Sequence, residues 1–317
     1  MSAPKVITAI LNWNGKGWLE KFLPSVVATT YSNHVVCVID NASTDDSIPF
    51  LKEHYQQVQI VQLDDNYGFT GGYNRGLAEL EADYFAILNS DVEVEPDWIS
   101  HLVERMQANP EIGAVQPKIL QYKQKDEFEY AGACGGFIDR FGFPFCRGRI
   151  FFSNEKDHGQ YNDARPVFWA TGAAMFIKAD LFKEFNGFDE DFFAHMEEID
   201  LCWRMQNMGH QVWVEPKAVV YHVGGGTLGA DNPRKTYLNF RNNLMMMAKN
   251  LPLGNAFVRI FFRMVLDGQA AIKELLGGNA GFFWAIGKAH FHFYLRLPQI
   301  AKKRKQIPHK VKLRTLP

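Results

Sequence analysis

The segment that decides the fold is His34-Val35-Val36-Cys37-Val38-Ile39-Asp40-Asn41-Ala42-Ser43-Thr44-Asp45-Asp46-Ser47. Its first part is apolar and β-branched, which is typical of a buried strand. A carboxylate closes that run, and good helix-capping residues follow it. The segment therefore predicts a strand over 34–39, a short turn, and a helix from about residue 47 to residue 55.

The same alternation of strand and helix continues on both sides of this segment. Strands are expected over 6–11, 58–63 and 84–88, and helices over 18–28 and 72–81. Alternation of this kind is typical of βαβ units on a parallel sheet, with the crossover helices covering both faces. We therefore expect an α/β fold with a mostly parallel sheet flanked by helices.

The second half of the chain is less regular. A helix is expected from Pro96 to about Asn109, and residues 122–163 are rich in Gly, Phe and charge without a clear period, which indicates loops and short strands. An apolar run over 173–177, a helix over 197–208 that stops at Gly209, and strands over 211–214 and 218–221 follow. Residues 1–230 are thus expected to form one domain.

Residues 231–317 are expected to form a C-terminal helical extension with a basic tail. A helix over 235–250 precedes apolar, aromatic segments that Gly277-Gly278 interrupts, and no acidic residue follows Glu274. A basic, aromatic-rich helical region suits peripheral contact with an anionic membrane. The alternative is a helical cap on the core with a solvated basic end.

The composition excludes several classes of partner and site. With 34 Lys and Arg against 35 Asp and Glu, no global field favours nucleic acid. The four cysteines are scattered without CxxC spacing, so buried free thiols are expected rather than a zinc or redox site. No window is apolar enough to span a membrane, and the N-terminus lacks the pattern of a secretory signal, so a cytoplasmic location is expected, with possible contact with the inner face of the membrane.

Polar residues fall at the ends of the expected strands, where open α/β sheets bind ligands. Asn12, Asp40, Asn66 and Asp91 are candidates by this position. Asp40 could accept hydrogen bonds from a nucleobase or ribose, or it could simply cap its loop. Asp91 could hold Mg²⁺ or Mn²⁺ against phosphate oxygens, or it could be a turn residue ahead of Pro96.

Three further segments could contribute to the same site. The glycine-rich loop 66–76 opens a helix, and its amides and Arg75 could approach a diphosphate. His222 ends an expected strand and could be a second metal ligand, although a lone His in such a place is usually structural. Arg241 could pair with phosphate or form an ordinary surface salt bridge.

An acidic cluster begins the helix at Glu197. Glu197, Glu198 and Asp200 lie in its first turn, where acids are stabilised by the helix dipole alone. The preceding loop is aromatic, however, and partial burial could raise a carboxylate pKa to the range that a general base needs. Both interpretations can hold for different members of the cluster.

Taken in order, these segments resemble the inverting family 2 glycosyltransferases of the GT-A fold, with likeness to the rhamnosyltransferase-like branch. The resemblance covers about residues 6–250. The motifs that carry it are Asn12, VIDNASTDDS (38–47), NYGFTGGYNRG (66–76), LNSDVEVEPDW (88–98), WATGAAMFIK (169–178), EEIDLCWR (197–204) and the segment of His222. Seven motifs in this order are specific, although each one is weak by itself.

The resemblance implies a role for each matched residue. Asp91 corresponds to the last acid of the family's metal motif, Asn89 replaces its first acid, and His222 is a second metal position. Glu198 is implied as the base, and Glu197 remains a competitor because the family often has Glu-Asp here. The residues implied in donor binding are Asn12, Asp40, Asn66, Gly68, Arg75, Asn89, Ser90 and Arg241. The residues implied in the acceptor wall are Trp169, Thr171 and Gly172, although Trp169 could equally be core.

The implied activity is metal-assisted transfer, with inversion, from a UDP- or dTDP-sugar to a hydroxyl of a glycan or lipid-linked glycan in cell-surface polysaccharide synthesis. Two alternatives remain open at this point. A sugar-phosphate nucleotidyltransferase could share the sheet, but Asn12-Trp13-Asn14-Gly15-Lys16-Gly17 matches its expected loop poorly. A non-catalytic, membrane-associated binding partner could keep the fold for binding only.

Overall fold

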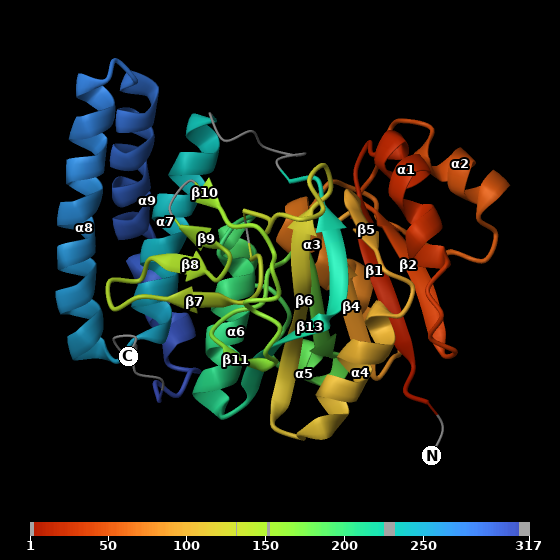
Figure 1. The fold of residues 1–317 in the computed structure, drawn as a ribbon. Helices are drawn as coiled ribbons and strands as arrows, with labels where there is room; N and C mark the ends of the chain where they lie inside the picture. Colours follow the sequence, from red (N-terminus) through yellow and green to blue (C-terminus); the bar gives the residue numbers. More distant parts are fainter. Residues whose placement is uncertain (1–2, 131, 151–152, 225–231, 311–317) are drawn as a thin grey trace.

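In the computed structural model, which describes residues 3–130, 132–150, 153–224 and 232–310, a nine-stranded mixed sheet runs through the molecule (Figure 1). Its order is β11-β13-β6-β12-β4-β1-β2-β3, and β5 pairs with β13. The strands of this sheet are β1 (Val6–Asn12), β2 (His34–Asp40), β3 (Gln59–Gln62), β4 (Tyr84–Leu88), β5 (Val92–Val94), β6 (Ile112–Gln121), β11 (Arg165–Val167), β12 (Ala174–Lys178) and β13 (Gln211–His222). Strands β3, β2, β1 and β4 are parallel, as are β6 and β13, while β12 is antiparallel to both β4 and β6.

The strand and helix alternation predicted for the first half is confirmed. The helices between its strands are α1 (Lys16–Val27), α2 (Ser47–His54) and α3 (Gly68–Ala78). The last of these begins four residues before the predicted start at Gly72. Gly68 has φ +68°, so the chain turns there in a conformation that favours glycine and enters the helix directly.

In the second half, one strand was missed and two predicted strands proved to be one. Strand β6 was not predicted, because Gln116, Pro117 and Lys118 interrupt the apolar pattern in its middle, yet most of the strand is buried. The strands expected over 211–214 and 218–221 form one strand, β13, with an irregularity between Glu215 and Val219. Pairing with neighbouring strands decides both outcomes, and a local pattern does not contain that information.

Helices cover both faces of the sheet, and each face has its own hydrophobic core. On one face α1, α2 and α4 (Trp98–Ala108) contribute residues such as Leu19, Leu51 and Trp98. On the other face α3, α5 (Ala179–Glu184), α6 (Glu197–Met208) and α7 (Pro233–Asn250) contribute residues such as Tyr73 and Trp203. All four cysteines are buried free thiols, as predicted.

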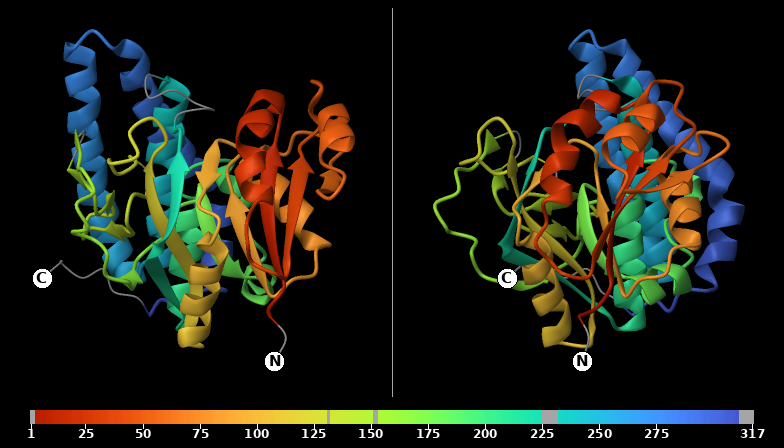
Figure 2. Two further views of the ribbon diagram at one scale, coloured as in Figure 1. Left: turned by 45° about the vertical axis from the view of Figure 1, so that its right-hand side comes forward. Right: turned by 90° about the vertical axis from the view of Figure 1, so that its right-hand side faces the viewer.

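The chain outside the sheet forms small hairpins and a helical group. The hairpin strands are β7 (Gly136–Ile138) with β8 (Pro144–Cys146), and β9 (Arg149–Ile150) with β10 (Ser153–Asn154). Helices α7, α8 (Leu253–Leu276) and α9 (Ala280–Arg304) stand together at one side of the molecule (Figure 2). The expected helical extension is therefore observed over 232–310, while residue 231 and the basic tail residues 311–317 lie outside the described part.

The long helices α8 and α9 lie side by side and run in opposite directions, and Gly277-Gly278 forms the turn between them, as predicted (Figure 1). Within residues 3–310, gaps excepted, none of the helices is both long enough and apolar enough to cross a bilayer.

The strand register brings several strand ends to one edge of the sheet. Asn12 at the end of β1 pairs with Asp40 at the end of β2, and Leu88 at the end of β4 pairs with Ala174 at the start of antiparallel β12. His222 at the end of β13 pairs with Gln121 of β6. Ligands bind at the carboxyl ends of strands in such sheets, so this edge is where a functional site is expected.

Candidate functional site

Asp40 and Asn12 form a buried pair at the ends of β2 and β1. Asn12 Nδ2 donates to Asp40 Oδ1 at 3.1 Å, and the Ser43 amide donates to Asp40 Oδ2 at 3.0 Å. Asp40 thus does cap its loop, by accepting the hydrogen bond from the Ser43 amide. Asn12 Oδ1 is buried without a hydrogen-bond partner in the described residues, so an acceptor remains open here for a ligand donor.

The glycine-rich loop is held together by its own polar side chains. Asn66 Oδ1 accepts from the Gly68 amide and from Asn41 Nδ2, both at 2.9 Å. A methyl group at Gly68 would lie 2.7 Å from the Phe193 ring, so a glycine is required there. The loop therefore packs directly against the segment that leads to Glu197.

Arg75 is less available to a diphosphate than predicted. Its Nη1 pairs with Glu190 Oε1 at 2.8 Å, and its guanidinium lies 3.9 Å from the centre of the Tyr67 ring. Both partners of the ion pair are substantially exposed, so the pair is worth little to stability. A ligand phosphate would have to compete with Glu190 for this guanidinium.

Asp91 and His222 meet between β5 and β13. Asp91 Oδ1 lies 3.2 Å from His222 Nε2, and both residues are buried. On the other side of the ring, His222 Nδ1 lies 3.4 Å from Glu129 Oε1. Although burial lowers the pKa of His222, the two adjacent carboxylates of Asp91 and Glu129 outweigh it and raise this pKa to about 10.

The spacing of Asp91 and His222 fits a divalent cation. Two ligand atoms at about 2.1 Å from an octahedral ion, on adjacent positions, lie about 3 Å apart. The described residues hold no group of three or more His, Cys, Asp or Glu arranged to coordinate a metal. Mg²⁺ and Mn²⁺ sites with few protein ligands are completed by phosphate oxygens and water, so the pair suits a metal brought together with a diphosphate. His222 would have to release its proton when such a cation binds.

Glu129 is a member of this cluster that sequence analysis missed. It is buried and comes from the loop after β6, in the stretch without periodicity. No spacing rule connects it with residue 91 or residue 222. Only the return of the chain to the end of β6 places it there, where its amide donates to the Ile119 carbonyl at 3.1 Å.

Asn89 and Ser90 lie between the end of β4 and Asp91. Both are half-buried, and the Asn89 amide donates to the Ala173 carbonyl at 3.0 Å. This bond ties the end of β4 to the start of β12. Within the described residues neither side chain makes a hydrogen bond. Both side chains are therefore free to contact a bound donor substrate.

Buried polar atoms without partners gather just before and inside the first turn of α6. Within the described residues, His195 Nε2, Glu197 Oε2 and Glu198 Oε2 are buried and make no hydrogen bond. Such atoms are rare in folded proteins, and three in four residues indicate a place where a ligand completes the hydrogen bonding. This concentration is the clearest mark of a functional site in the structure.

Burial changes the acidity of both glutamates, as predicted. It raises the pKa of Glu198 to about 7, against the effect of backbone amides that lower it. Burial and the neighbouring Glu198 charge raise the pKa of Glu197 well above its ordinary value. Glu198 is half-buried while Glu197 is almost completely covered, so Glu198 is the better placed of the two to meet an acceptor.

The loop that presents these glutamates has a strained backbone. Phe193, His195 and Met196 have φ of +66°, +69° and +72°, a region that residues with side chains rarely adopt. Asn242 Nδ2 donates to the carbonyls of Phe192, Ala194 and His195 at 3.0, 2.8 and 2.7 Å. Helix α7 thus holds the loop in this conformation.

Arg241 differs from its predicted role. Its guanidinium is buried, and its nitrogens donate to Asn242 Oδ1, to Tyr237 Oη and to the carbonyls of Asp191 and Phe192. Four of its five N–H groups are therefore used within the protein, which leaves at most one for a diphosphate, and its buried position is not that of a surface salt bridge. Its contacts instead hold the loop before Glu197, together with Asn242.

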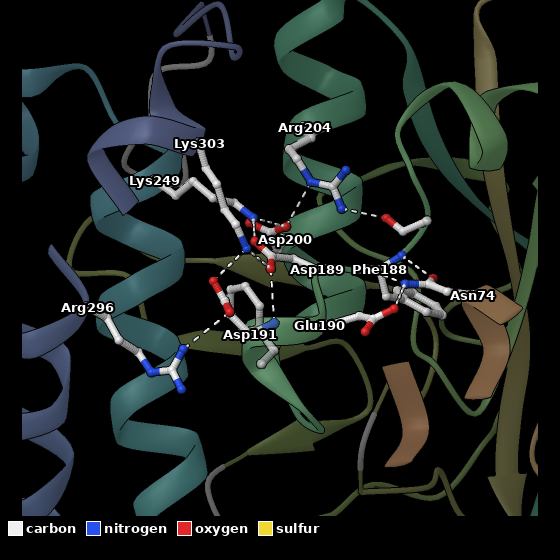
Figure 3. A network of polar contacts seen from close by, with 12 residues as sticks. Asn74, Phe188, Asp189, Glu190, Asp191, Asp200, Arg204, Lys249, Arg296 and Lys303 are labelled. Atoms are coloured by element: carbon white, nitrogen blue, oxygen red, sulfur yellow. Dashed lines mark hydrogen bonds and ion pairs between the residues drawn. The ribbon is translucent and has the colours of Figure 1, made fainter. Parts of the chain in front are cut away.

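A buried charge network anchors the same region to α7 and α9 (Figure 3). Lys249 Nζ pairs with Asp189 Oδ2 at 2.6 Å and with Asp200 Oδ2 at 2.7 Å, and Arg204 Nε donates to Asp200 Oδ2 at 2.8 Å. Lys303 of α9 reaches Asp189 as well. Asp200 is thus the structural member of the acidic cluster, as one of the two interpretations allowed.

The three residues predicted for the acceptor wall have different environments. Trp169 is 5% exposed and its Nε1 donates to the Phe137 carbonyl at 2.7 Å, so its ring belongs to the core, which was the alternative interpretation. Thr171 is also buried, and its amide donates to Gln116 Oε1 at 3.0 Å. A methyl group at Gly172 would lie 3.9 Å from Glu198 Cβ and 3.3 Å from the Phe69 ring.

Gly172 therefore connects the parts of the site. It lies beside Glu198, and the next residue, Ala173, bonds to Asn89 two positions before Asp91. The structure brings Asp40, Asn66, Asp91, His222 and Glu198 to one edge of the sheet. Trp169 and Arg241 are the two predicted site residues that instead support it from within the protein.

Comparisons with known proteins agree with this geometry. The family model described as glycosyl transferase family 2 matches residues 6–181. An N-acetylglucosaminyl-diphospho-decaprenol L-rhamnosyltransferase of Mycobacterium tuberculosis is 25% identical over 276 residues, which cover 81% of this chain and 88% of that protein. A low-salt glycan biosynthesis hexosyltransferase of Haloferax volcanii is 24% identical over 250 residues, 75% of each protein.

Solved structures show the same fold. GalNAc-T7 with UDP, GalNAc and Mn²⁺ has a TM-score of 0.63 at 14% identity and covers 93% of this chain and 58% of its own. The mannosyltransferase PcManGT from Pyrobaculum calidifontis, with GDP-Man and Mn²⁺, has a TM-score of 0.56 at 13% identity and covers 93% and 87%. These findings confirm the predicted fold and the resemblance to the rhamnosyltransferase-like branch: the chain belongs to glycosyl transferase family 2 and is an inverting glycosyltransferase with the GT-A fold.

Proposed function

We propose that this glycosyltransferase moves a sugar from a UDP- or dTDP-sugar to a hydroxyl of a lipid-linked glycan, in the synthesis of a cell-surface polysaccharide. The observation that carries the proposal is Glu198, a half-buried carboxylate with an unpaired oxygen and a pKa raised to about 7, at the sheet edge that also holds Asp91 and His222. The names of the relatives in M. tuberculosis and H. volcanii support a glycan acceptor, and the first of them supports a lipid-linked one.

In this mechanism Glu198 takes the proton from the acceptor hydroxyl. The hydroxyl oxygen forms a bond to the anomeric carbon while the bond from that carbon to the diphosphate oxygen breaks on the opposite side, so the configuration inverts. A carboxylate with a pKa near 7 is both ionised and basic enough for this role at neutral pH. Glu197 remains the competing base, since it lies next to Glu198 and is also unpaired.

Asp91 and His222 are the residues that would hold Mg²⁺ or Mn²⁺. Bound there, such a cation would neutralise charge on the departing nucleotide diphosphate. Two solved structures of the same fold contain Mn²⁺ with a nucleotide or nucleotide sugar, which supports this assignment. Asn89 and Ser90 flank Asp91 and would contact the same end of the donor.

The remaining site residues divide between donor and acceptor. Asp40, held by Asn12, would recognise the base or ribose, and the loop of Asn66 and Gly68 would line the nucleotide. Arg75 would join them only by leaving Glu190. Gly172 would allow the acceptor to approach Glu198 because it adds no side chain between them.

A screen of nucleotide sugars tests the proposal. UDP- and dTDP-linked sugars, with GDP-linked sugars as the matched control, are incubated with the full chain and Mn²⁺, and binding and slow hydrolysis are measured. Turnover of a UDP- or dTDP-sugar supports the proposal. Turnover of GDP-sugars alone would contradict the proposed UDP- or dTDP-sugar donor. Absence of any turnover or binding would favour a non-catalytic binding partner.

A peripheral location on the inner face of the cytoplasmic membrane is part of the proposal. A lipid-linked acceptor is encountered at a bilayer, and the end of the chain from Leu275 onward contains no acidic residue but many basic ones. Such a region is attracted to anionic lipids.

A further inference from the structure

Helix α8 is inverted relative to an ordinary amphipathic helix. Two of its charged residues, Arg263 and Asp267, are buried, while large apolar side chains point outward. An ordinary surface helix buries its apolar stripe and exposes its charges. The exposed positions that define the outer face of α8 are Phe257, Phe261, Phe262, Val265, Ile272 and Leu276.

The buried charges fix which side of α8 faces outward. Arg263 Nε pairs with Asp267 Oδ1 at 2.7 Å, and its Nη1 donates to Asn243 Oδ1 of α7 at 2.6 Å. Asp267 Oδ2 lies 3.2 Å from His290 Nε2 of α9. Rotating the helix to bury the phenylalanines would break these buried polar contacts. The contacts therefore fix the orientation in which the apolar side chains are exposed.

Helix α9 extends the same surface. Trp284 is 70% exposed, and Phe291 and Leu295 follow it on the same side at helical spacing. The two helices touch where Tyr294 Oη lies 3.4 Å from Met264 Sδ. So many large apolar side chains exposed on two adjacent helices are unusual on a monomeric protein and indicate a partner or a membrane.

Charge around the surface identifies the partner. Lys288 and Lys302 are exposed on α9, and the sequence contains no acidic residue after Glu274. A symmetric contact pairs each residue of this face with a different residue of the second copy, and Lys288 and Lys302 would find no acidic partner on its α9, which contains no Asp or Glu. An anionic lipid surface would instead attract them, and Trp284 suits the boundary between headgroups and acyl chains.

A shallow hollow beside the outer face has matching chemistry. Its volume is about 360 Å³, and it is lined by Arg140, Phe141, Val258, Arg259 and Phe262. The lining thus combines two arginines with three apolar side chains. This combination suits a phospholipid, whose phosphate is anionic and whose chains are apolar.

From these observations we propose that the outer face of α8, with the adjoining face of α9, lies in the headgroup region of an anionic membrane. The helices lie along the bilayer surface and insert their aromatic side chains, and the basic residues contact lipid phosphates. The biological role of this membrane contact rests on the proposed function, because a lipid-linked acceptor would be bound at the membrane surface. Its physical basis is the α8–α9 surface together with the adjoining hollow.

Vesicle flotation of the full chain tests the inference. Vesicles of phosphatidylcholine with 30% phosphatidylglycerol are compared with pure phosphatidylcholine at ~0.1 M salt. The variant Phe257→Ser/Phe261→Ser removes two exposed rings, and Arg140→Gln removes a charge from the hollow. The control Met208→Ser changes an exposed apolar residue at the end of α6, away from this surface.

We expect the native chain and Met208→Ser to float with the anionic vesicles and to be released by high salt. The double variant should lose about tenfold or more of its binding, and Arg140→Gln should lose less. Equal flotation of the double variant and the native chain would overturn the inference. So would a lipid-free dimer in sedimentation velocity that the double variant abolishes, because the occupant would then be a second copy.

Two further measurements separate this inference from the proposed function. The thermal midpoint of each variant shows that it is folded, since the changed side chains are exposed in the native chain. Hydrolysis of the nucleotide sugar without vesicles should be unchanged in the double variant. Loss of flotation with intact hydrolysis supports the membrane surface, whereas normal flotation with no hydrolysis in the native chain would contradict the proposed function only.

Discussion

At the residue scale, the proposed mechanism depends on which of two adjacent glutamates meets the acceptor. Glu198 is half-buried beside Gly172, while Glu197 is covered. Glu198→Gln keeps the shape of the side chain but removes its basicity. We expect kcat to fall about 10³-fold with little change in the KM for the donor, measured by transfer or hydrolysis kinetics.

Glu197→Gln is the matched control for that experiment. It should retain much more activity, and it should be more stable than the native chain at pH 8, because the raised pKa of Glu197 means that its ionised form destabilises the fold there. A larger loss of kcat in Glu197→Gln than in Glu198→Gln would transfer the base role to Glu197.

The raised pKa of Glu198 also predicts a pH profile. The group must be ionised to accept a proton, and burial raises its pKa to about 7. We expect kcat to rise about tenfold per pH unit below pH 7 and to level off above it, in initial rates with saturating donor. A profile that levels off near pH 4.5 would show that no buried carboxylate controls the step.

The proposed metal site at Asp91 and His222 predicts a metal requirement. We expect EDTA to abolish transfer and Mn²⁺ or Mg²⁺ to restore it, and we expect Asp91→Asn to need a higher metal concentration, in rates measured as a function of free metal. Asn33→Ala, which changes an exposed side chain bonded to the Ala3 carbonyl, is a control. Full turnover of the native chain after chelation would rule out the metal role of Asp91.

At the element scale, helix α7 holds the strained loop that leads to Glu198, the proposed base. Asn242→Ala leaves three carbonyls without their donor, so the loop 192–196 should relax. A displacement of about 1 Å at a catalytic group costs on the order of 10²-fold in rate. We therefore expect kcat to fall by about that factor, with a smaller change in the KM for the donor.

Asn239→Ala is the control on the same helix, because within the described residues its side chain makes no hydrogen bond. It should behave like the native chain. If Asn242→Ala lowers thermal stability but leaves kcat unchanged, the contact is structural only, and Asn242 does not position Glu198.

At the scale of the whole molecule, α7 and α9 are joined to the transferase fold by buried charge. Lys249 is 3% exposed and pairs with both Asp189 and Asp200 (Figure 3). Removing Lys249 leaves these two buried carboxylates only partly compensated, Asp189 by Lys303 and Asp200 by Arg204. We expect Lys249→Met to destabilise the chain by about 3–5 kcal/mol in urea unfolding, whereas Lys302→Met on exposed α9 surface should change it little.

The same network gives stability a dependence on acid. Burial opposes ionisation of Asp189, but Lys249 and Lys303 outweigh it and hold the pKa of Asp189 below its ordinary value. Its contribution is therefore complete above about pH 4, the ordinary range of the group, and is lost as pH falls further. The urea midpoint of the native chain should fall more steeply below pH 4 than that of Lys249→Met.

Local patterns were sufficient for the sheet of the first half and for the residues at its edge. Strand and helix periods depend on neighbours within a few positions, so β1 to β4 and the strand ends at Asn12, Asp40 and Asp91 could be predicted from sequence. The acidic start of α6 and the family itself could be predicted in the same way, because each motif is contiguous. Strand β6 could not, since buried polar residues interrupt its pattern.

The sequence by itself determined the transferase fold, the family and the set of chemical groups available at the sheet edge. Only the tertiary structure decided how these groups are used: Glu129 joins His222, Trp169 enters the core, Arg241 and Asn242 hold the loop before Glu198, and α8 turns its apolar side outward. The physical reason is separation along the chain. These contacts join residues tens of positions apart, and their energies exist only once the chain has folded, so no local pattern contains them.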